Sequence, residues 1–88
     1  MLKQIDTVLI KDLLHLAMKL NYNDSYPFHI AVDFSGISDI VTVRTVYKSD
    51  IYAGNYDWDF AYSMSTCLIN DESSVDLYEA IKEIRSHV

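Results

Sequence analysis

The sequence predicts a single α+β domain over residues 1–88, in which two helices pack against a three-stranded antiparallel meander. The chain has 88 residues and half of them are hydrophobic, enough for the core of one domain. Hydrophobic residues recur with a helical period near both ends of the chain and with a period of two in the middle. Short loops join the period-two segments, as in a meander. The predicted order is helix–strand–strand–strand–helix.

The first helix is expected over residues 6–20. Its start suits Asp6 or Thr7 as the N-cap. Residues 21–27 are dense in turn formers, and Pro27 prevents the helix from continuing. The apolar residues recur three and four positions apart: Ile5, Leu9, Leu13, Leu16, Ala17 and Leu20.

Three strands are expected over residues 28–35, 40–48 and 56–67, with loops at 36–39 and 49–55. Alternation along each strand assigns one face to the core and leaves the other open to solvent. The core face would contain Phe28, Ile30, Val32, Phe34, Val41, Val43, Phe60, Tyr62 and Met64, with Tyr47, Tyr56 and Trp58 in the same phase. The open face would be polar, with His29, Asp33, Thr42, Arg44, Asp57, Asp59 and Ser63, and Val46 and Lys48 in phase with them.

The second helix is expected to begin at Ser73, because Ser73-x-x-Asp76 fits a capping box. Asp71 and Glu72 precede it, where the helix dipole favours negative charge. Its apolar stripe contains Leu77, Tyr78, Ile81, Ile84 and Val88. The two helices would cover the apolar face of the sheet.

Cysteine content favours a reducing, cytoplasmic setting. Cys67 is the only cysteine, which excludes an internal disulfide and a multi-cysteine zinc site. No signal peptide is recognised, and no run approaches the roughly 20 apolar residues that span a bilayer. The three histidines show no metal-ligand spacing and there is no glycine-rich phosphate loop. We therefore expect no metal and no cofactor.

Acidic residues are concentrated in one part of the chain. Seven Lys and Arg against 13 Asp and Glu give a formal charge of −6, which argues against direct binding to nucleic acid or to a membrane. Between Lys48 and Lys82 there is no Lys or Arg. Seven acids fall in that window: Asp50, Asp57, Asp59, Asp71, Glu72, Asp76 and Glu79. This pattern predicts an acidic face, although loop aspartates and acids at a helix start are also ordinary turn and capping chemistry.

Aromatic residues gather beside these acids. Ile51 and Tyr52, in an otherwise polar loop, suit anchors for a partner's pocket. Asp57 and Asp59 would project from one strand face about 6.7 Å apart, a spacing comparable to the phosphates of a nucleic acid; the alternative is that Arg44 pairs with Asp59. The predicted partner-binding residues are Asp50, Ile51, Tyr52, Tyr56, Asp57, Asp59, Asp71, Glu72, Asp76 and Glu79.

An enzyme is the least favoured hypothesis. His29 and Asp33 share a strand face but lie about 13 Å apart, so a His–Asp pair would need another strand, as with Asp57. An open sheet face also offers no cleft for a nucleophile and base. The lone Cys67 is expected to be a buried small hydrophobe rather than a reactive thiol.

We therefore expect a non-enzymatic acidic protein that binds and inhibits a cationic partner, a basic protein or a nucleoprotein complex that processes nucleic acid. In size, acidity and layout the chain resembles the small inhibitors that phages make against host defence enzymes, anti-CRISPR proteins among them. The resemblance spans the whole chain and rests on layout, so it implies no site residues; it implies action in the host cytosol, with nucleic-acid mimicry as one mode. The alternative is an assembly subunit that forms a homodimer through an edge strand or the open sheet face.

Overall fold

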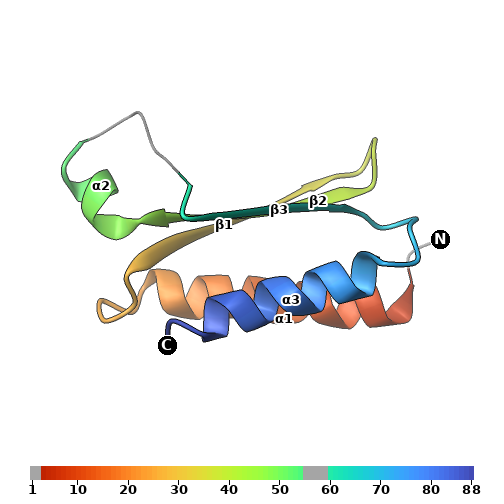
Figure 1. Cartoon of the computed structure of the whole chain (residues 1–88), viewed down its shortest axis with the longest axis horizontal. Coiled ribbons are helices and arrows are strands. Elements are labelled where there is room, and N and C mark those ends of the chain that lie inside the picture. The colour runs from red at the N-terminus through yellow and green to blue at the C-terminus, as the bar shows by residue number, and fades with distance from the viewer. Residues whose placement is uncertain (1–2, 55–59) are drawn as a thin grey trace.

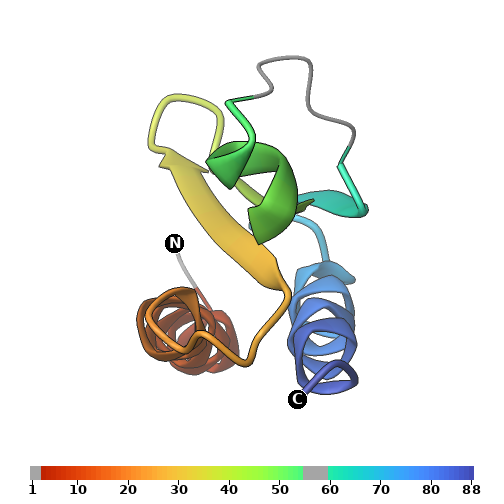
Figure 2. The ribbon, with the colours of Figure 1, turned by 90° about the vertical axis from the view of Figure 1, so that its left-hand side faces the viewer.

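The computed structural model describes residues 3–54 and 60–88. Its elements are α1 (Gln4–Asn21), β1 (Phe28–Ser35), β2 (Ile40–Tyr47), α2 (Lys48–Tyr52), β3 (Tyr62–Cys67) and α3 (Ser73–Arg85). The strands form one antiparallel sheet in the order β1-β2-β3. Helices α1 and α3 lie beside each other against one face of this sheet, as Figures 1 and 2 show. The predicted α+β fold is confirmed, with the short helix α2 added between β2 and β3.

The core lies between the sheet and the two long helices. Register pairs Val32 with Val43 and Val43 with Met64, which brings the apolar side chains of all three strands to the helical side. Removing these side chains from water is the main force that stabilises the layered arrangement. The buried hydrophobic cluster contains Leu9, Leu13, Ala17, Leu20, Tyr26, Phe28, Ile30, Val41, Val43, Leu68, Leu77, Ala80, Ile81 and Ile84. Among the described residues, no helix combines the length and apolar character needed to cross a membrane.

Several aromatic residues assigned to the core are exposed instead. Phe60 is 49% exposed, and it precedes β3, which begins only at Tyr62, so strand alternation does not govern its direction. The guanidinium of Arg44 lies 5.2 Å from the centre of the Phe60 ring. Phe34, near the end of β1, and Tyr78 on α3 are also exposed. Tyr56 and Trp58, which share the alternation, lie outside the described residues.

The chain turns into α2 where the sequence predicts an extended strand end and a loop. Lys48 was expected on the open polar face, but it begins α2 and is only 8% exposed. Its Nζ donates hydrogen bonds to the carbonyl oxygens of Leu20 (3.0 Å) and Asn23 (2.8 Å). The last carbonyls of a helix have no partner within the helix and carry partial negative charge. The Leu20 carbonyl in the last turn of α1 and the Asn23 carbonyl just beyond the helix explain why a lysine is stable in this buried position.

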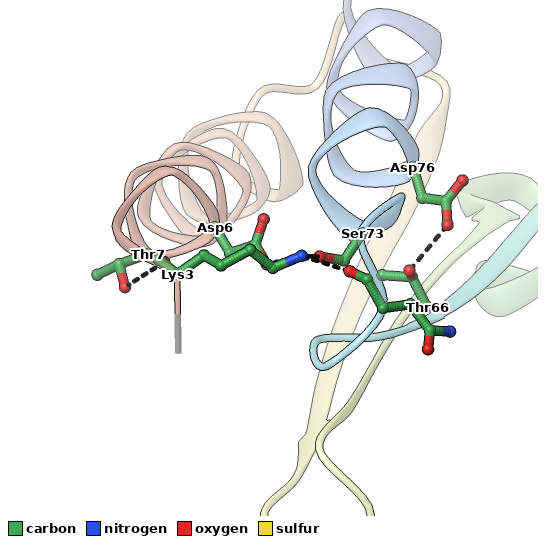
Figure 3. Close-up of polar contacts among 7 residues, drawn as sticks. Lys3, Asp6, Thr7, Thr66, Ser73 and Asp76 are labelled. Atoms are coloured by element: carbon green, nitrogen blue, oxygen red, sulfur yellow. Dashed lines mark hydrogen bonds and ion pairs between the residues drawn. The ribbon is translucent and has the colours of Figure 1, made fainter. Parts of the chain in front are cut away.

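The predicted helix caps are wrong, and the reason is a contact between the two helix starts. Lys3 and Glu72 are the N-caps of α1 and α3, and neither makes a side-chain capping bond. Asp6 is completely buried and accepts a 2.6 Å hydrogen bond from Ser73 Oγ, which in turn accepts one from Lys3 Nζ (Figure 3). Asp76 accepts a hydrogen bond from Thr66 Oγ1 instead of completing a capping box. Partners distant in sequence thus replace the local caps.

Candidate interaction site

The two edges of the sheet differ at Ile30, where a side chain closes the β1 edge. Asn21, the last residue of α1, lies against the outer side of Ile30. Its Oδ1 accepts a hydrogen bond from the Ile30 N–H (2.7 Å), and its Nδ2 donates one to the Ile30 carbonyl (2.9 Å). The Asn21 amide therefore occupies the groups that an additional strand would need at this position.

The β3 edge is open over its central residues. The Leu68 N–H donates to the Asp39 carbonyl (2.8 Å), immediately beyond the Ile40–Cys67 pair. Because hydrogen-bonded and non-hydrogen-bonded pairs alternate in an antiparallel ladder, Ser63 and Ser65 belong to non-hydrogen-bonded pairs. Their backbone N–H and C=O groups point away from β2. Within residues 3–54 and 60–88 these outward groups have no hydrogen-bond partner.

Three carboxylates of α3 follow this open edge; we call Asp76, Glu79 and Glu83 the acidic row. Asp76 Oδ2 accepts a 2.8 Å hydrogen bond from Thr66 Oγ1 near the end of β3. At the start of β3, burial raises the pKa of Tyr62, and the charges of Glu83, Glu79 and Asp76 raise it further, in that order. The row spans about 10 Å along the helix axis, which is shorter than the roughly 17–20 Å of the six-residue β3. Figure 2 shows α3 lying beneath β3.

One positive charge lies beside the acidic row. Lys82 lines an open hollow on this flank together with Tyr62, Glu79 and Glu83. Its side chain is not within 4.0 Å of a described carboxylate. The flank of β3 is therefore acidic in balance, with one cation among three carboxylates.

The predicted acidic face is divided between the two ends of the molecule. Asp50, Ile51 and Tyr52 belong to α2 at one end of the sheet. The turn between β3 and α3, which carries Asp71 and Glu72, lies at the other end (Figure 1). Three further predicted residues, Tyr56, Asp57 and Asp59, lie outside the described residues, and with them the predicted Arg44–Asp59 pair.

A second acidic feature is the turn before α3. Asp71, Glu72 and Asp76 line an open hollow of about 400 Å³ together with Ile69 and Asn70. The Lys3 ammonium donates to the Asn70 carbonyl beside this hollow. In the described part of the chain, no three His, Cys, Asp or Glu side chains are grouped so as to hold a metal ion.

The open sheet face is polar and carries few charges. Thr42 and Ser65 are cross-strand neighbours joined by a 2.9 Å hydrogen bond, and Arg44 lies between Ala31 and Ser63. Val46, assigned to this face, is buried at the end where α2 packs on β2.

The histidines form no catalytic pair among the described residues. His29 and Asp33 are both exposed on β1, four register pairs apart along the strand. The Nε2 atom of His87 lies 3.3 Å from Glu83 Oε1, and the His87 ring meets Phe28 edge to face with ring centres 4.8 Å apart. Cys67 is half-buried, and its Sγ lies 3.6 Å from the Ser38 carbonyl.

Sequence reasoning missed two residues that shape the site. Asn21 falls in the segment of turn formers that follows the predicted first helix, and its role depends on Ile30, nine positions away. Glu83 lies four positions after Glu79 and seven after Asp76, a spacing that places the three on one helix face. This periodicity could have identified the acidic row, whereas the window without cations ended at Lys82 and excluded Glu83.

Comparison of the chain with protein-family models, with curated proteins and with solved structures finds no match.

Proposed function

We propose that this chain is a non-enzymatic interaction protein that binds a cationic partner along β3 and the acidic row. The observation that carries the proposal is the difference between the two sheet edges. The Asn21 amide closes the edge at Ile30, whereas Ser63 and Ser65 present outward N–H and C=O groups. An exposed edge binds an extended segment through main-chain hydrogen bonds, and neighbouring side chains select its sequence.

The side chains of β3 leave this edge accessible. Natural edge strands are commonly protected by lysine, proline or inward-pointing charge. The sequence of β3 is Tyr-Ser-Met-Ser-Thr-Cys, which contains none of these. Ser63 and Ser65 are exposed and small, so a second backbone can approach closely.

The acidic row selects for a basic segment. Lys or Arg side chains on a strand added to β3 would project near Asp76 at one end and near Glu79 and Glu83 at the other. Opposite charges across an interface accelerate association and reject partners of like charge. The same charges oppose the alternative of a homodimer, because antiparallel pairing of two β3 strands would bring two acidic rows together.

The partner class that we propose is an enzyme or complex that processes nucleic acid, as in the anti-CRISPR type of inhibitor. Such partners carry cationic grooves for the phosphate backbone. A protein seated at such a groove inhibits by occupying it. This part of the proposal is supported by the acidity of the chain and by its layout. Mimicry of a phosphate backbone would additionally require Asp57 and Asp59, which lie outside the described residues.

The test measures binding to a library of hexapeptides that alternate Lys or Arg with Val or Thr. Ser65→Pro removes the outward N–H and blocks the edge without removing a backbone hydrogen bond to β2. Ser65→Ala is its matched control, because both changes lose the side-chain hydrogen bond between Ser65 and Thr42. We expect Ser65→Pro to abolish binding of the best peptide and Ser65→Ala to retain it. Equal binding by both variants would refute strand addition.

The charge contribution is tested in the same assay. The double variant Glu79→Gln/Glu83→Gln should weaken peptide binding and flatten its dependence on salt, because exposed charge pairs are screened within about 8 Å at physiological ionic strength. Asp12→Asn, on an exposed position of α1, is the matched control. Affinity that is independent of salt and of the acidic row would refute the assignment of a basic partner.

A further inference from the structure

A small aromatic pocket lies where the C-terminal part of α3 meets the sheet. It is lined by Tyr26, Phe28, Tyr47, Tyr62, Glu83 and His87, among others. We propose that this pocket binds an alkylammonium group, either as a small free cation or as the methylated or unmodified end of a lysine side chain. The inference does not depend on strand addition at β3.

The size of the pocket suits such a group. Its volume is about 130 Å³, close to that of an engineered cavity of about 150 Å³ that binds benzene. A trimethylammonium head with its first methylene has five heavy atoms, roughly the same bulk. The pocket is therefore large enough for a compact cation, and too small for a folded peptide or a nucleotide.

The aromatic rings are held in place by the fold. Phe28 and Tyr47 are register partners on β1 and β2, and their ring centres lie 4.8 Å apart. The Tyr26 ring meets Phe28 edge to face at 5.9 Å, and Tyr26 Oη donates a 2.9 Å hydrogen bond to the Ile84 carbonyl. Tyr26 and Phe28 are 2% and 6% exposed. Such a rigid group of rings attracts a cation through its quadrupoles without having to reorganise.

The charge of the pocket favours a cation. Among the described lining residues, Glu83 is the only acid and no Lys or Arg is present. Burial is the largest cause that raises the pKa of Tyr26 and of Tyr62, and the negative charge of Glu83 is the second largest. The negative potential of Glu83 therefore reaches both rings. The Glu83 carboxylate is half-buried beside His87, which keeps it close to the pocket.

One of these aromatic rings, that of Tyr26, already lies near a cation of the chain itself, the Lys48 ammonium. Lys48 Nζ lies 5.9 Å from the centre of the Tyr26 ring. It is held by the carbonyls of Leu20 and Asn23, and Lys48 does not line the pocket. A bound ammonium group would contact Phe28, Tyr47 and Tyr62, which line the pocket.

An alkylammonium fits better than the competing classes of ligand. A guanidinium presents five N–H donors in a planar fork, and one carboxylate would leave most of them unpaired. A neutral hydrocarbon would have no electrostatic attraction to the Glu83 carboxylate. A methylated ammonium spreads its charge over apolar methyl groups, which suits an aromatic wall beside a single carboxylate.

The test is an NMR titration of the full chain with choline and with its neutral isostere 3,3-dimethylbutan-1-ol. We expect choline to shift the signals of Tyr62 and His87 and to bind about tenfold more tightly than the isostere. Titrations with the acetylated amides of trimethyllysine and lysine show whether the pocket accepts a side chain as well as a free cation. Equal affinity for choline and its isostere, no binding by any of these cations, or shifts confined to other regions would overturn the proposal.

Variants separate the pocket from non-specific binding. Glu83→Gln and, independently, Tyr47→Leu should each weaken choline binding by about fivefold or more. Asp12→Asn removes the same charge far from the lining residues and should change the affinity by less than about twofold. Circular dichroism confirms that each variant is folded before it is compared. Unchanged affinity in folded Glu83→Gln and Tyr47→Leu would overturn the assignment.

Discussion

Replacing Asn21 with Ala should destabilise the domain and open the β1 edge. The change removes two hydrogen bonds to Ile30, at 2.7 and 2.9 Å. An intramolecular hydrogen bond contributes about 1 kcal/mol net, and more where the remaining partner is kept from water. Alanine has a higher helix propensity than asparagine, which offsets the loss of stability by about 0.5 kcal/mol. The free energy of unfolding should therefore fall by about 1.5–2 kcal/mol.

Urea denaturation measures this change directly, and thermal unfolding should show a midpoint lower by about 10 °C for a domain of this size. Asn23→Ala is the matched control, because the exposed Asn23 side chain accepts only a local hydrogen bond from the Ser25 N–H; its cost should be about 0.5 kcal/mol or less. Stability in Asn21→Ala that is equal to or above that of the parent chain would refute the edge-closing role.

Three further predictions concern buried polar groups. Asp6→Ala should lower the free energy of unfolding, measured by urea denaturation, by about 2–3 kcal/mol, because it leaves the Ser73 hydroxyl without its buried acceptor. A loss no larger than that caused by Asp12→Ala, at an exposed position, would contradict this. Lys48→Met should cost about 2 kcal/mol by removing the two hydrogen bonds that the ammonium donates to the Leu20 and Asn23 carbonyls; a neutral or stabilising effect in the same assay would show that the carbonyls do not need the ammonium. Because burial, and then Glu83, raise the pKa of Tyr26 above its ordinary 10.0, its stabilising contribution is complete below pH 10 and is lost as the pH rises through the folded-state pKa. Unfolding measured from pH 8 to 11.5 should show this loss, and Tyr26→Phe should reduce it; an equally steep loss in the variant would contradict the assignment.

The sequence predicts the layered fold because its main signals are local. Alternation along β1 and β2 correctly assigns Ile30, Val41 and Val43 to the core, since successive side chains on a strand point to opposite faces. The same reasoning fails where a strand ends. It places Lys48 on the open face, although the chain has already turned into α2. It also directs Phe60 inward, although β3 begins after it.

The candidate site was less predictable because it depends on contacts between remote segments. The closing of one edge requires Asn21 to reach Ile30, and the burial of Asp6 requires Ser73, 67 positions away. Neither contact leaves a periodic pattern in the sequence. Charge counting identified Asp76 and Glu79, which do lie along β3, but it combined them with Asp50, which the fold places at the other end of the sheet.

Amide hydrogen exchange at Ser63 and Ser65 tests the central claim most directly. These two N–H groups point away from β2 and should exchange rapidly in the free chain. On binding the best basic hexapeptide, we expect both amides to become protected together, since an added strand bonds to alternate residues of the edge. Protection confined to other elements, with Ser63 and Ser65 still exchanging rapidly in the bound state, would contradict the account.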